Sequence, residues 1–334
     1  MATQDERLKH LYETRLKPKL EQFEPQRKSV QDKVLFVTII IFVICVIIPV
    51  YWIIQRETLQ DGLKLSFLIL VFFFSSVGFF YRKLTSSYRI KFKKEVVGDI
   101  VTFVDENLTY YPERMITRAE FKKSLFEKYW RLSIDKLSGE DYVEGMLGST
   151  AVKFSEVKAV SEHDNFVFKG LFFIFDFHKD FEGFTVVLPK LWDPFKLAYR
   201  RGPGERINLA EPEFKQEFIV YSDNQITARY VLSTSLMRRL FKFRRQQQKP
   251  VYLSFVNGTL YMGIFIYKDL FEPRIFRTLL DYNLVREFSE YMQLAKDIVE
   301  ELNLNTRIWS KGIVNKYQET SRSILTDNVL NQFN

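Results

Sequence analysis

Asp176 and His178 are the residues of this 334-residue chain whose types and spacing come closest to acid–base chemistry. A carboxylate two residues from an imidazole on one strand face can fix the ring's tautomer and make it a better general base. Asp180 lies just beyond. No nucleophile or phosphate-binding loop accompanies the pair, so the alternative is a strand that becomes polar where it leaves a core. Asp176 and His178 are therefore weak catalytic candidates.

Other catalytic and metal-binding signals are absent from the sequence. It contains no Walker loop, no G-x-G-x-x-G, no H-E-x-x-H and no G-x-S-x-G, which disfavours nucleotide-driven and classical hydrolase functions. The chain has three histidines and a single cysteine, Cys45, so a metal site would depend on carboxylates and no internal disulfide can form. We therefore predict neither a metal site nor a cofactor.

A basic surface is the second candidate site. The segment 236–245 has an apolar helical stripe on one face and cations on another, and a loop with two more arginines precedes it. Anionic lipid is the polyanion that this surface best fits, with a solvated helix face as the alternative. Few aromatics are interleaved for base stacking, which disfavours nucleic acid. The cations are Arg238, Lys242, Arg245, Arg200 and Arg201.

Two apolar segments are long enough to span a membrane and would hold both candidate sites near it. Residues 34–54 carry no charge over twenty-one positions, and at 1.5 Å per residue such a helix crosses a hydrocarbon layer of about 30 Å. Residues 65–81 are shorter, but Lys64 and Arg82 can snorkel outward and extend the usable length. The pattern predicts a transmembrane hairpin over residues 34–81.

The cations around the spans predict the orientation. Within about twenty residues of the spans, six Lys and Arg residues precede the first span and six follow the second, whereas the short link holds only Arg56 and Lys64. Translocation disfavours cations close to a span, so both termini should be cytoplasmic. Residues 1–33 then form a basic cytoplasmic N-terminal helix, which we expect to be broken near Pro18 and to end near Pro25.

The rest of the chain predicts a cytoplasmic α+β domain over 82–305 and a polar tail over 306–334. Thr117 and Glu120 form a capping box that starts a short helix. From about residue 140, four strand-like segments separated by turn-rich breaks predict an antiparallel meander, and the sheet should be mostly antiparallel, with helices packed on it. The segments are "DYVEGMLG", "AVKFSEVKAVSE", "FVFKGLFFIFDFHK" and "FTVVLPK".

The segment "FVFKGLFFIFDF", residues 166–177, is the most aromatic part of this region. Its uncharged part, 170–175, is too short to span a bilayer even as a strand. It predicts a central strand covered on both faces, with Gly170 as a bulge. A filled core is the main interpretation, and a ring-lined ligand or lipid cavity is the alternative.

Later signals extend the sheet. "EFIVYSD" and "ARYVLS" predict two strands around the turn at 223–224. Two alternating apolar runs flank Asn257-Gly258, which favours a type I′ hairpin. Apolar residues at three- and four-residue steps predict a long helix over 284–302.

"YVEGMLG", "VKFSEVKAV", "VFKGLFFIFDFHKDFEGFTVVLP", "FIVYSDNQITARYVLS" and "VYLSFVNGTLYMGIFIYKDLFEP" together resemble a bacterial family of uncharacterised membrane proteins, domain of unknown function 3137. The resemblance covers most of 141–273, and the two spans in front match the family's usual layout. It implies a bacterial cytoplasmic-membrane protein and supplies no catalytic residues.

We therefore expect a membrane-anchored scaffolding or interaction module with no enzymatic activity. Its partners would be the lipid bilayer, anionic lipids, a membrane protein or a second copy, since Ser75, Ser76 and Gly78 allow close helix packing. The alternative is a protein that binds lipid or another hydrophobic ligand at the inner membrane surface. A membrane-proximal enzyme using carboxylates and His178 is the third hypothesis.

Overall fold

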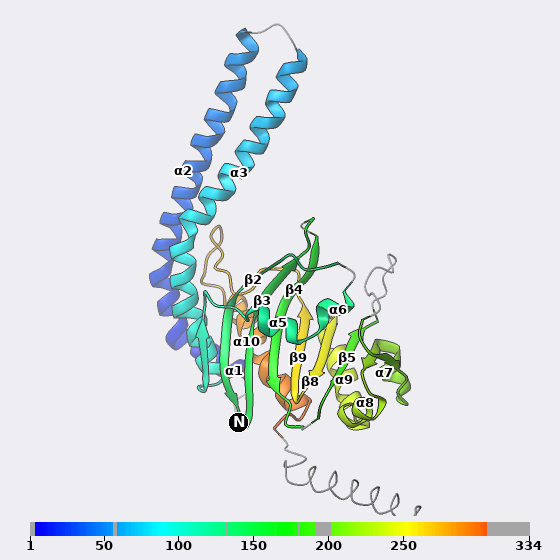
Figure 1. The fold of residues 1–334 in the computed structure, drawn as a ribbon. Coiled ribbons are helices and arrows are strands. Elements are labelled where there is room, and N and C mark those ends of the chain that lie inside the picture. Colours follow the sequence, from blue (N-terminus) through cyan, green and yellow to red (C-terminus); the bar gives the residue numbers. More distant parts are fainter. Residues whose placement is uncertain are drawn as a thin grey trace, which may run out of the picture. The chain divides into compact units, whose positions relative to one another are not determined.

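The computed structural model describes residues 4–55, 59–130, 132–163, 165–179, 181–190 and 202–305. The chain divides into two compact units (Figure 1). Met1–Ile100 and Phe271–Ser289 form the helical unit, and Val101–Leu270 with Glu290–Asn334 form the sheet unit. Of the domain predicted over 82–305, residues 82–100 and 271–289 fall in the helical unit.

The helical unit is built on two long helices. Helix α1 (Gln4–Leu11) continues through a π-helical turn, Tyr12–Leu16, into α2 (Lys17–Gln55). Helix α3 (Leu59–Phe92) continues through a second π-helical turn, Lys93–Val97, into α4 (Gly98–Val104). Figure 1 shows α2 and α3 side by side, and Phe42 meets Phe73 edge-to-face at 6.1 Å between ring centroids.

Both prolines near the N-terminus lie within helix, so the expected break near Pro18 and end near Pro25 are wrong. Lys17 donates its backbone N–H to Tyr12 O, which closes the π-helical turn, and Pro18 then sits in the first turn of α2, where a missing N–H costs little. Just before Pro25, α2 packs against α3, since the ring centroids of the buried Phe23 and Phe92 lie 5.9 Å apart.

The apolar parts of α2 and α3 are exposed rather than packed. Two helices, Asp5–Ile47 and Phe67–Val104, are long and apolar enough to cross a membrane, and their most apolar windows are only 6% and 0% buried. Phe36 and Phe72 point large apolar side chains outward. The predicted spans 34–54 and 65–81 lie in α2 and α3, respectively.

The sheet unit is α+β, as predicted, with a mostly antiparallel sheet. Among the described residues, nine strands form one sheet in the order β1-β2-β3-β4-β9-β8-β5-β7-β6. The strands are β1 (Leu108–Tyr111), β2 (Lys136–Leu147), β3 (Thr150–Val160), β4 (Phe166–Asp176), β5 (Phe184–Pro189), β6 (Glu205–Ile207), β7 (Phe218–Ser222), β8 (Val251–Val256) and β9 (Thr259–Phe265). The helices are α5 (Arg118–Lys123), α6 (Phe126–Tyr129), α7 (Pro212–Glu217), α8 (Gln225–Val231), α9 (Thr234–Gln247) and the later part of α10 (Tyr282–Glu301).

The predicted meander is confirmed from β2 to β4 and is wrong for β5, and β1 adds a strand beside β2 that was not predicted. The hairpin β8–β9 lies between β4 and β5, so β5 pairs with β8 and β7 instead. The turn of that hairpin is confirmed, with φ of +46° at Asn257 and +79° at Gly258. "ARYVLS" is not a strand, because Asn224 accepts the Ile226 N–H at 2.7 Å and so caps α8.

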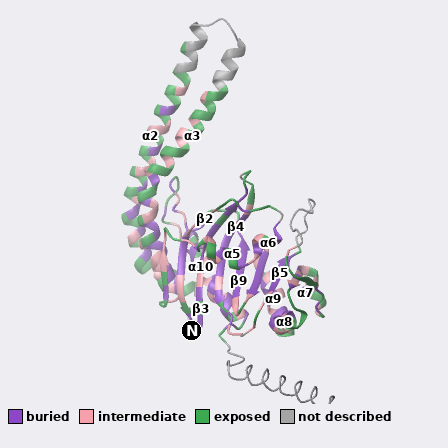
Figure 2. Ribbon diagram, in the orientation of Figure 1, coloured by how far each residue is buried: buried purple, intermediate pink, exposed green. Residues whose placement is uncertain are grey.

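The phenylalanine-rich segment is the middle of the core. Strand β4 lies between β3 and β9 and is covered on both faces, as predicted (Figure 2). On one face Phe168 and Phe172 pack against Phe121 of α5 and Trp130 after α6. On the other face Phe173 contacts Phe154 of β3 at 5.1 Å. On both faces of β4, aromatic rings therefore pack against other aromatic rings.

Gly170 keeps two strands in register and is not a bulge. Its φ is +151°, and a Cβ there would lie 2.0 Å from the Ile264 carbonyl oxygen of β9. The irregularity falls elsewhere, since the pairing of β3 with β4 skips Val167. Glycine is required at residue 170 by the approach of β9, not by an extra residue.

Candidate functional site

The structure brings Asp176 and His178 together in a different way from the one predicted. Strand β4 ends at Asp176, and His178 has a φ of +53°, so the two do not share a strand face. The Asp176 carboxylate lies 3.4 Å from His178 Nδ1 and accepts the His178 backbone N–H at 3.2 Å. His178 Nε2 lies 3.0 Å from Ser149 O. Asp180 lies outside the described residues.

This arrangement favours a role in holding the loop. Both ring nitrogens of His178 face protein oxygens, and the side chain is only 5% exposed. A general base needs a free nitrogen within reach of a substrate proton. In this conformation neither ring nitrogen of His178 is available to a substrate. The contact with Ser149 instead joins the end of β4 to the β2–β3 turn.

The basic stripe lies on one exposed face of α9. Ser233 caps the helix, and its cations follow at steps of four and three residues. Arg238, Lys242 and Arg245 are each more than 60% exposed. Arg200 and Arg201 lie outside the described residues.

Each cation of the stripe has an acidic neighbour. Arg238 lies 3.6 Å from Glu211, Lys242 lies 3.2 Å from Glu301, and Arg245 lies 3.0 Å from Glu217. Ion pairs this exposed contribute about 0–1 kcal/mol, so a denser anionic surface can replace these carboxylates at low cost.

A shallow depression of about 600 Å³ adjoins this stripe. It is lined by Thr234, Ser235, Arg238, Arg239, Lys242 and Glu301. Hydroxyl groups and guanidinium groups are common donors to phosphate and carboxylate oxygens. Glu301 already accepts from Lys242, and Arg239 donates to the Glu301 backbone oxygen at 2.9 Å. Away from Glu301, the hydroxyl groups of Thr234 and Ser235 and the guanidinium of Arg238 can therefore bind an anion in this depression.

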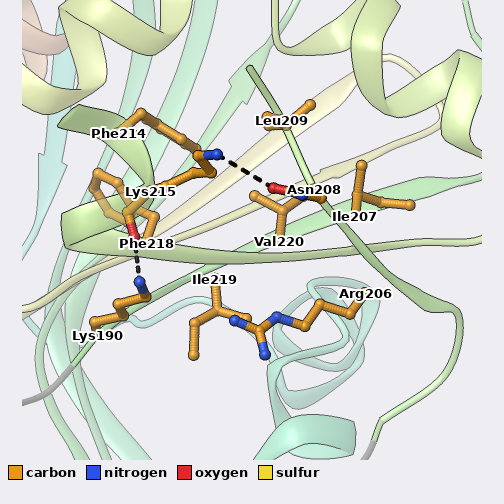
Figure 3. Close-up of a pocket in the computed structure, with 10 residues that line it drawn as sticks. All are labelled: Lys190, Arg206, Ile207, Asn208, Leu209, Phe214, Lys215, Phe218, Ile219 and Val220. Atoms are coloured by element: carbon orange, nitrogen blue, oxygen red, sulfur yellow. Dashed lines mark hydrogen bonds between the residues drawn. The ribbon is translucent and has the colours of Figure 1, made fainter. Parts of the chain in front are cut away.

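A second depression, of about 310 Å³, lies between α7, β6 and β7 (Figure 3). Lys190, Arg206 and Lys215 contribute cationic groups, and the apolar lining includes Phe214 and Phe218. Lys215 donates to Asn208 Oδ1 at 3.4 Å, and Lys190 donates to the Lys215 backbone oxygen. An apolar molecule with an anionic head fits this chemistry. No sequence motif marks it, because the three cations come from separate elements.

Glu156 is a buried carboxyl that sequence reasoning missed. It is 5% exposed on β3 and accepts the Leu270 backbone N–H at 2.8 Å. Burial raises the pKa of Glu156 to about 8, and the nearby carboxylates Asp141, Glu140 and Asp269 act in the same direction, while the Leu270 hydrogen bond opposes them. Lys169 pairs with Asp269 at 2.5 Å.

No metal centre emerges from the part of the chain that the structure describes. In those residues no three His, Cys, Asp or Glu side chains are grouped so that they could hold an ion.

Comparison with protein families gives one match. Residues 166–304 match the family described as protein of unknown function (DUF3137), a stretch that runs from the start of β4 to just beyond α10. The resemblance seen in the sequence is thereby confirmed for this stretch, which is less than half of the chain. Comparisons with curated proteins and with solved structures gave no match. The family description names no activity.

Proposed function

We propose that this DUF3137-containing chain is a non-enzymatic interaction module anchored in a bacterial cytoplasmic membrane. The observation that carries the proposal is the contrast between two kinds of apolar surface. In the sheet unit, Phe154, Phe168, Phe172 and Phe173 are buried and pack against aromatic neighbours, whereas the apolar windows of α2 and α3 are at most 6% buried. Exposed apolar helices of this length need lipid around them.

The orientation follows from the charges beside the helices. Lys and Arg residues precede residue 34 and follow residue 81, so both termini lie in the cytoplasm in this proposal. The sheet unit then stands at the inner membrane surface, where it scaffolds a membrane protein or a second copy of the chain.

Crosslinking in native membranes tests the scaffolding role. A photoreactive residue in place of Ser75, which is exposed on α3 beside Ser76 and Gly78, should yield a covalent homodimer or one reproducible larger adduct. The same residue in place of Lys122, exposed on α5, serves as the control and should give far less of that product. Monomer alone at both positions would contradict the scaffolding role.

The stripe on α9 is proposed to contact anionic lipid. Each well-placed cation contributes about 1 kcal/mol at an anionic surface, so three of them contribute about 3 kcal/mol. Hydrogen exchange over residues 234–247 of the full chain should be slower in nanodiscs with anionic lipid than in neutral ones. Replacing Arg238, Lys242 and Arg245 with serine should abolish the difference, and high salt should reduce it in the wild type.

A matched triple variant controls for net charge. Lys122, Lys123 and Lys136 are exposed cations of the same unit that lie outside α9. Their replacement with serine should leave the lipid-dependent protection of 234–247 unchanged. Equal exchange of the wild type in neutral and anionic nanodiscs would rule out the lipid contact.

A further inference from the structure

The segment 271–281 of the helical unit runs along α3 toward the predicted span. At its start, Glu272 accepts hydrogen bonds from Arg89 at 2.5 Å and forms an ion pair with Lys93 at 2.8 Å. Four residues later, Phe276 stacks on Tyr81, with ring centroids 6.4 Å apart and an interplanar angle of 13°. Tyr81 lies eight residues before Arg89 in α3, about 12 Å nearer to the membrane at 1.5 Å per residue.

Contacts with α2 lie on both sides of residues 276–278. Arg27 donates to the Ile275 backbone oxygen, and the Leu279 N–H donates to Glu24 at 3.3 Å. Ile275 and Leu279 are buried, so both sides of the loop are fixed to the helices. Residues 276–278 are therefore the tip of a loop that is held on both sides. Because Phe276 stacks on Tyr81, the tip lies beside the end of the predicted span 65–81.

The tip is apolar, cationic and exposed. Phe276 remains 54% exposed although one of its faces stacks on Tyr81. Arg277 is exposed beside it, and Arg82 and Lys83 are exposed on α3 directly after Tyr81. Aromatic rings with neighbouring cations are the side chains that occupy the boundary between hydrocarbon and headgroups.

We propose that residues 276–278 insert into the headgroup boundary of the membrane that holds α2 and α3, as a contact additional to the two helices and to the stripe on α9. The bilayer is the occupant because the loop is continuous with the span through the Phe276–Tyr81 stack. This inference rests on the proposed membrane anchoring. Because Glu272 and Phe276 contact α3 while Ile275 and Leu279 contact α2, insertion of the loop would also hold the helical unit at a defined depth in the membrane.

Environment-sensitive labelling of single cysteines tests the contact in the full chain. In a Cys45→Ala background, the labelled positions are Phe276→Cys and Thr278→Cys at the tip, Phe72→Cys in the span and Lys9→Cys on the exposed face of α1. In nanodiscs, the labels at 276 and 278 should show blue-shifted emission, quenching by a shallow lipid-borne nitroxide and loss of quenching by aqueous iodide. The label at residue 9 should show the reverse.

The outcomes separate this inference from the anchoring itself. Labels at 276 and 278 that iodide quenches as fully as the label at residue 9, while the label at 72 is protected, would overturn the loop contact and leave the anchor intact. A label at 72 that iodide also quenches would overturn the anchor and the loop contact together. Two tip positions are used so that an effect of one substitution on folding does not decide the result.

Discussion

At pH 9 the Glu156→Gln variant should be more stable than the wild type by about 4 kcal/mol, and at pH 4 the two should be nearly equal. Burial raises the pKa of Glu156 to about 8 in the folded protein, against an ordinary value of 4.5. The glutamine side chain has almost the same shape, and its amide oxygen can still accept the Leu270 N–H.

The direction of the effect follows from proton linkage. Between pH 4.5 and about 8 the folded protein keeps the Glu156 proton that the unfolded chain has already lost. Stability therefore falls as pH rises through this window and levels off above it. The variant carries no titrating group at residue 156, so its advantage should grow over the same window.

Chemical denaturation of the full chain in detergent, at several pH values, measures this difference. Trp130 is a suitable probe because its ring stacks on Phe168 within the sheet unit. Glu113 is an exposed carboxyl, and Glu113→Gln should follow the wild-type pH curve. A constant offset between Glu156→Gln and the wild type from pH 4 to pH 9 would show that Glu156 does not titrate in this window.

Replacing Phe172 with alanine should lower the free energy of unfolding of the sheet unit by about 3–5 kcal/mol. The ring is fully buried and lies 4.7 Å from Phe121 and 6.1 Å from Phe126. Removing it leaves a cavity that these neighbours, held by α5 and α6, can fill only in part. Loss of the aromatic contacts adds to the loss of buried area.

Phe166 on the same strand provides the control. It is 56% exposed, and the Lys158 ammonium lies 5.0 Å from its ring centroid. Phe166→Ala should therefore cost about 1 kcal/mol or less. Equal losses for the two variants in the same denaturation experiment would contradict a filled core around β4 and favour the ring-lined cavity.

The features that the sequence predicted correctly are local ones. The Thr117–Glu120 capping box, the Asn257-Gly258 turn and the apolar period of α10 each depend on residues close in sequence, and the structure contains all three. The helix α8 was misread because Asn224 serves equally well in a turn and as a helix cap. Pro18 was misread because the π-helical turn before it is defined by a backbone hydrogen bond, from the Lys17 N–H to Tyr12 O, which the residue types do not indicate.

The features that were missed depend on distant partners. Glu156 appears in an ordinary alternating strand, and its hydrogen bond to Leu270 joins residues 114 positions apart. Lys190, Arg206 and Lys215 line the same depression in Figure 3 because β7 lies between β5 and β6 in the sheet. The candidate residues on α9 were found from helical spacing. The carboxylates beside them come from the residue that precedes α7, from α7 itself and from α10.

The position of the β8–β9 hairpin has a consequence for biosynthesis. Strands β4 and β5 leave the ribosome early, but the two strands that join them, residues 251–265, are translated some sixty residues later. Until then, both long apolar helices have already been translated, while Phe173 and Phe175 lack the β9 neighbour that pairs with them. Cotranslational chaperones should therefore engage this chain before residue 259 is translated and release it only once β9 has emerged.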